Sequence, residues 1–157
     1  MTTLEYYQGT AKKMNIFQND YESRLQSWYN LKQQAKQLEL RDKCIEIDDW
    51  WQKAPLVNRH LHTMDIENWP NPWELLVENT YCEVARALGM CYTLHMTNVF
   101  DIELVEAVDN MGNDVVLVLV DSAKYILNYW PNTVVNNCLH DFRIRRTINI
   151  TTLLEKL

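Results

Sequence analysis

Residues 79–96 read NTYCEVARALGMCYTLHM, and this stretch decides which fold the rest of the chain is expected to adopt. It opens with a capping-box pattern, in which Thr80 would cap a helix and Glu83 would reach back to the cap. Apolar residues then recur at helical spacing as far as Gly89, which suits the left-handed position after a helix. Beyond Gly89, apolar and polar residues alternate as on a strand. The pattern predicts a short helix followed by a strand over 90–96.

The region before this stretch carries helical patterns. Residues 3–40 contain no proline and a single glycine, and apolar residues recur every three or four positions. This spacing predicts a long amphipathic arm or a helical hairpin, with a bend at 18–20 where polar residues interrupt the stripe. A further helix is expected over 41–53, before Pro55. Residues 1–54 are therefore predicted to form an N-terminal helical arm.

The region after it carries strand patterns. Apolar or alternating runs cover 102–108, 115–120, 124–130 and 142–150, and residues typical of turns separate them. Before them, Pro72 favours the first turn of another short helix. The fold class is predicted as α+β, with N-terminal helices followed by a mostly antiparallel four- or five-stranded sheet. Residues 55–157 are expected to form this α+β sheet domain.

Composition excludes several classes of function. The chain has 157 residues and a net charge of −6, and a broad nucleic-acid interface needs a basic face instead. Its longest apolar run, 115–120, is too short to span a bilayer, and its first residues lack the pattern of a signal peptide. With three glycines, the chain has no glycine-rich phosphate loop. We expect neither nucleic acid nor a membrane as a partner, and we expect reduced cysteines.

Metal ligands are present in the sequence, but their spacing is not that of a common metal site. His60 and His62 form one pair, and Cys138 and His140 form another. Nothing in the sequence brings the two pairs together, and the acidic stretch 101–121 lacks the EF-hand pattern. We therefore expect no metal and no cofactor.

An aromatic stripe on the N-terminal helices is the strongest candidate for a partner surface. It either packs on the sheet of its own chain or docks against other subunits, and the sequence leaves both open. Two arginines on the outward face of the last predicted strand are further candidates, with the acidic stretch 101–121 as their complement in the same chain or a neighbour. The predicted partner-binding residues are Tyr7, Met14, Tyr21, Leu25, Trp28, Arg143 and Arg145.

Cys82 is the candidate nucleophile, because a helix start favours the thiolate form of a cysteine. Such a thiolate still needs a general base and an orienting group. The alternative is that Cys82 is a small apolar residue that packs on the flank of the helix.

The segment Cys82-Glu-Val-Ala-Arg-Ala-Leu-Gly-Met, followed by strands, resembles the core of the transglutaminase-like cysteine hydrolases. In that family a cysteine opens a helix, and two later antiparallel strands carry a histidine and an aspartate. The resemblance places the histidine at Asn113-Asp114 and the aspartate at Asn128. The general base is therefore missing, and no catalytic residue is expected. His95 or His140 could supply the base only through an unusual arrangement, and if the protein is active, we expect its catalytic residues to be Cys82, His95 and Asn128.

A second resemblance covers NWPNPWELL and YCEVARALGM together with AKYILNYWPNTVVN. These segments resemble small proteins of the structural modules of tailed bacteriophages. The resemblance implies a virion protein of the neck, tail or baseplate, assembled in the host cytoplasm, whose partners are other virion subunits and copies of itself. Our main hypothesis is a non-catalytic structural or assembly subunit that acts through protein–protein contacts. The alternative is a transglutaminase-like cysteine hydrolase that uses Cys82.

Overall fold

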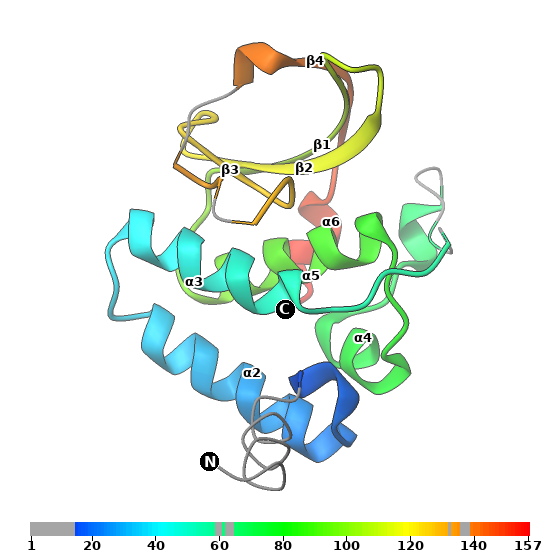
Figure 1. Ribbon diagram of the computed structural model, residues 1–157. Coiled ribbons are helices and arrows are strands. Elements are labelled where there is room, and N and C mark those ends of the chain that lie inside the picture. Colours follow the sequence, from blue (N-terminus) through cyan, green and yellow to red (C-terminus); the bar gives the residue numbers. More distant parts are fainter. Residues whose placement is uncertain (1–14, 59–60, 62–64, 132, 136–138) are drawn as a thin grey trace, which may run out of the picture.

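The helices and the sheet form three layers in a computed structural model, which describes residues 15–58, 61, 65–131, 133–135 and 139–157 (Figure 1). The sheet lies on one side, the helices α3 and α5 form the middle layer, and α2 and α4 lie on the far side. The helices are α2 (Tyr21–Ala35), α3 (Leu40–Gln52), α4 (Pro72–Glu78), α5 (Glu83–Met96) and α6 (Thr151–Glu155), with short 3-10 turns η1 (Ile16–Gln18), η2 (Ile66–Asn68) and η3 (Leu139–Asp141).

The sheet has four antiparallel strands in the order β3-β2-β1-β4, which confirms the predicted α+β class. The strands are β1 (Ile102–Asp109), β2 (Asp114–Val120), β3 (Tyr125–Leu127) and β4 (Phe142–Ile148). β3 is shorter than the predicted run 124–130, because Asn128 adopts a left-handed backbone conformation with φ of 67° directly after it. Between β1 and β4 the register shifts after Glu106, which leaves Arg145 as the extra residue of a bulge.

The prediction for residues 90–96 was wrong, since α5 continues without a break through Gly89 to Met96. The helix lies between the sheet and the other helices (Figure 1), so it is buried on nearly all sides. A helix buried in this way loses its polar face, and its residues then fit an alternating pattern as well as a helical one. Gly89 is needed for close packing: a Cβ at this position would lie 2.6 Å from the ring of Trp51.

The predicted capping box was also displaced. Cys82 is the N-cap of α5 and makes no side-chain capping bond, while the Thr80 hydroxyl donates to the Glu78 carbonyl at 3.3 Å. A capping box does occur one helix earlier, where Asn71 and Glu74 exchange hydrogen bonds at the start of α4. The same kind of signal therefore marks α4 instead of α5.

The described helices share one core with the sheet. The Thr93 hydroxyl of α5 accepts hydrogen bonds from the indoles of Trp28 in α2 and Trp51 in α3, at 2.9 and 3.0 Å. It also donates to the Gly89 carbonyl at 2.8 Å. All three side chains are buried, so this hydroxyl joins three helices inside a continuous apolar cluster that extends to the sheet.

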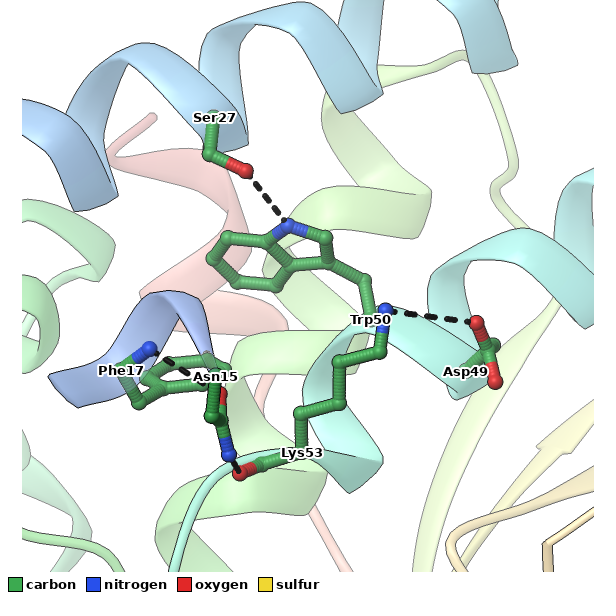
Figure 2. A network of polar contacts seen from close by, with 6 residues as sticks. All are labelled: Asn15, Phe17, Ser27, Asp49, Trp50 and Lys53. Carbon is green, nitrogen blue, oxygen red and sulfur yellow. Dashed lines mark hydrogen bonds and ion pairs between the residues drawn. The ribbon is translucent and has the colours of Figure 1, made fainter. Parts of the chain in front are cut away.

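A second set of contacts fixes η1 and α2 against the end of α3 (Figure 2). The Asn15 amide donates to the Lys53 carbonyl, and its oxygen accepts from the Phe17 amide at 3.0 Å. The Phe17 ring meets the Trp50 ring edge-on at 4.9 Å. Trp50 in turn donates to the Ser27 hydroxyl of α2 at 3.0 Å. The predicted bend at 18–20 is confirmed, since η1 ends at Gln18 and α2 begins at Tyr21.

Candidate functional site

Cys82 is the N-cap of α5, directly before its first residue, so a cysteine stands at the start of this helix as the family resemblance requires. Its backbone is extended, with φ of −114° and ψ of 178°, and its carbonyl accepts the first helical bond from the Arg86 amide at 3.0 Å. The side chain is 1% exposed and belongs to the main apolar cluster. The position suits a nucleophile, but a substrate carbonyl could reach the sulfur only after the surrounding side chains moved.

Asn128 is the centre of a buried polar network beside the first turn of α5. Its amide donates to the carbonyls of Glu83 and Val116, at 3.2 and 2.9 Å. Its side-chain oxygen accepts from Arg86 Nε at 2.8 Å, and its backbone N–H donates to Asp48 Oδ1 at 2.8 Å. The network thus joins α3, α5, β2 and the end of β3 at the place where the family resemblance locates the aspartate.

No imidazole joins this network among the described residues. Val116 is the residue of β2 that Asn128 contacts, and its side chain is apolar and buried. Asp114, which opens β2 at the position of the family's histidine, is exposed and pairs with Arg145 at 3.0 Å. The histidine of the resemblance is therefore replaced by residues that cannot take a proton from Cys82 in this arrangement.

The four histidines of the chain do not fill this gap in the described structure. His95 lies near the other end of α5, about 20 Å along the helix axis from Cys82 at ~1.5 Å per residue. Its ring packs against Phe100 with centroids 5.4 Å apart. His140 is exposed on η3 beside Asp141, at 3.3 Å. His60 and His62 lie outside the described residues, as does Cys138.

Burial controls the electrostatics of the network. Burial raises the pKa of the Asp48 carboxyl above its usual value of 3.8 and lowers the pKa of the Arg86 guanidinium. It also raises the pKa of the Cys44 thiol to about 12, so that this neighbouring thiol stays protonated. The network is therefore built from groups whose charged forms are disfavoured by their surroundings.

Asp48 and Arg86 were not predicted as site residues. Asp48 is 2% exposed although it is acidic, and it follows Cys44 by four residues on the apolar face of α3. An acidic residue at that spacing on an apolar stripe was the available signal. Arg86 lies within α5 and is 9% exposed. A charged residue among the apolar residues of this helix was the corresponding signal.

The structure places the predicted partner-binding residues in different environments. Trp28 is 1% exposed and hydrogen-bonded to Thr93, so it packs within its own chain. Tyr21 and Leu25 are partly buried against the same core. Arg143 and Arg145 are exposed on β4. Tyr7 and Met14 lie outside the described residues.

Two further features bear on cofactors and membranes. Within the described part of the chain, no group of three histidine, cysteine, aspartate or glutamate side chains is arranged to hold a metal ion. None of the described helices combines the length and apolar character needed to cross a bilayer.

Comparison with known proteins identifies the fold. No family model and no curated protein matches the chain. Its structure is similar to calcium-bound Legionella pneumophila LapG, with a TM-score of 0.68 and 14% identity over 94% of this chain and 84% of LapG. A second LapG structure has a TM-score of 0.68 and 14% identity over 96% of this chain and 84% of LapG. EGTA-treated LapG has a TM-score of 0.67 and 15% identity over 95% of this chain and 83% of LapG. LapG is a transglutaminase-like cysteine protease.

The chain therefore has a transglutaminase-like fold. The similarity agrees with the sequence resemblance around Cys82 and gives no link to bacteriophage proteins.

Proposed function

We propose that this protein is a non-catalytic transglutaminase-like domain, which keeps the fold of a cysteine hydrolase and acts by binding other polypeptides. The observation that carries the proposal is the network around Asn128, in which the side-chain oxygen accepts from Arg86 and the backbone N–H donates to Asp48, while no described imidazole adjoins Cys82. A thiol without a neighbouring base is a weak nucleophile, and burial of Cys82 further limits access.

An open groove between α2 and α4 supports the binding role. It has a volume of about 440 Å³ and includes Leu25, Tyr29 and Trp73 in its lining. Tyr29 and Trp73 are 52% and 40% exposed, and such aromatic side chains are enriched where proteins meet. Lys32 lies at the same groove with its ammonium 3.5 Å from the Trp28 ring centroid, which adds a charge to the apolar surface.

The second candidate is a cysteine hydrolase that uses Cys82. It is supported by the similarity to LapG and by the position of Cys82 at the start of α5 with Asn128 nearby. The structural comparison favours this alternative over the virion hypothesis, which rests on the sequence resemblance alone.

Hydrolysis of fluorescent casein separates the two candidates. The wild type is compared with Cys82→Ala and with Cys91→Ala, whose cysteine lies in the same helix and is equally buried. We expect the same background rate of casein hydrolysis for all three proteins, with no turnover that depends on Cys82. Turnover that is lost in Cys82→Ala and retained in Cys91→Ala would contradict the proposal and establish the hydrolase alternative.

A further inference from the structure

A small cavity lies between α3 and the segment that follows β3. Its volume is about 110 Å³, well above the ~10–15 Å³ that a cavity needs to hold one water molecule. Ile45 on one side and Val134 and Val135 on the other supply apolar walls, and Asp48 supplies a carboxylate. Val134 is held in place because its carbonyl accepts the Ile126 amide of β3 at 3.2 Å. The cavity therefore combines apolar walls with an acidic group.

One oxygen of the Asp48 carboxylate is unused. Oδ1 accepts both hydrogen bonds of this side chain, from the Asn128 amide at 2.8 Å and from Gln52 Nε2 at 3.3 Å. Among the described residues, Oδ2 accepts no hydrogen bond and Asp48 takes part in no ion pair, although the residue is 2% exposed. Oδ2 is not among the fully enclosed side-chain oxygens that lack a partner, so it keeps a small contact with solvent through which a donor group can approach it.

Among the described residues, no nearby cation forms an ion pair with Asp48. Asp49, the other acidic residue at the cavity, is paired with Lys53 at 3.6 Å (Figure 2). Arg86 donates its Nε to Asn128 and forms no ion pair with Asp48, although its charge lowers the pKa of Asp48 by less than burial raises it. Burial raises the pKa of Asp48 despite Arg86, so a cation placed at Oδ2 would stabilise the charged form of this carboxyl.

We propose that this cavity binds a primary alkylammonium group, with the ammonium on Asp48 Oδ2 and the alkyl chain against Ile45 and Val134. An ammonium is a compact donor that a single free oxygen can bind. A guanidinium is less suitable, because its fork is matched to two carboxylate oxygens and Oδ1 is already occupied. The group can come from a free amine or from a lysine side chain, and the proposal is independent of the function proposed above.

Calorimetric titration of the full chain with n-butylammonium tests the site. We expect a dissociation constant on the order of 1 mM, because the ligand is small, and no measurable binding of n-butanol or butyrate. Asp48→Asn keeps the shape of the side chain and should weaken binding at least tenfold. Asp49→Asn is the matched control from the same helix and should change the affinity less than twofold.

A variant at the cavity wall guards against loss of the Asp48 network. Val135 is 39% exposed, so Val135→Trp should leave the melting temperature nearly unchanged while its indole fills the cavity and abolishes binding. Titration with Nα-acetyl-lysine N-methylamide identifies the source: binding shows that a lysine side chain can enter, and its absence restricts the site to free amines. Equal affinity of the wild type and Asp48→Asn, equal affinity for n-butanol, or no binding of n-butylammonium would each overturn the proposal.

Discussion

The Thr93 hydroxyl offers a direct test of how the helices are held together. Thr93→Val removes the oxygen while keeping the shape of the side chain, so no cavity is formed. The indole N–H groups of Trp28 and Trp51 would then lose their acceptor in the core, where these side chains are 1% and 0% exposed. A buried donor without a partner costs about 1–3 kcal/mol. Allowing for partial relaxation, we expect the free energy of unfolding to fall by ~3 kcal/mol.

Urea unfolding followed by tryptophan fluorescence and circular dichroism measures this loss. Thr97→Val is the matched control, because Thr97 lies at the end of the same helix and is also fully buried. Its hydroxyl only donates, to the carbonyls of Thr93 and Leu94 at 2.9 and 3.0 Å, so its removal strands no other donor. We expect a loss of under ~1 kcal/mol for the control. Equal losses in the two variants would refute the assignment of Thr93 as the acceptor that joins the helices.

Three further predictions concern packing, buried charge and surface charge. Gly89→Ala should lower the free energy of unfolding by about 1–2 kcal/mol in urea titrations, because overlap with the Trp51 ring exceeds the gain of ~1 kcal/mol in helix propensity. Asp48→Asn should be more stable than the wild type at pH 7 in thermal unfolding. Because the pKa of Asp48 is raised in the folded state, the free energy of unfolding of the wild type falls as the pH rises through that pKa. The melting temperatures of the two proteins should therefore converge below the usual value of 3.8. A constant difference between them across pH would contradict this prediction. Arg145→Glu breaks an exposed pair with Asp114 and should change the free energy of unfolding by no more than about 1 kcal/mol, whereas a larger loss would mean that the pair is structural.

The sheet could be predicted from the sequence because its strands carry strong local signals. The continuous apolar run of β2 and the turn before it are recognisable without knowledge of their neighbours. The extent of α5 could not be predicted, because Cys91 and Thr93 point into the core from a helix that is buried on nearly all sides. Period and polarity separate helix from strand only when one face meets water.

The candidate site was predicted in part. Cys82 and Asn128 were identified through the family resemblance, and the structure places both at the first turn of α5. His95 was named as the base only for the case that the protein is active, and the structure places it near the far end of the helix. The roles of Asp48 and Arg86 depend on hydrogen bonds between segments far apart in the chain, which no local pattern reports.

The central claim, that Cys82 is a buried residue of a non-catalytic domain, is tested most directly by its alkylation rate in the native protein. The protein is treated with iodoacetamide near pH 6, and each cysteine peptide is quantified by mass spectrometry over time. Because Cys82 is 1% exposed, we predict labelling slower than that of a free thiol and accelerated only by denaturant. Rapid and selective labelling of native Cys82 at this pH would show an accessible thiolate and would contradict the claim.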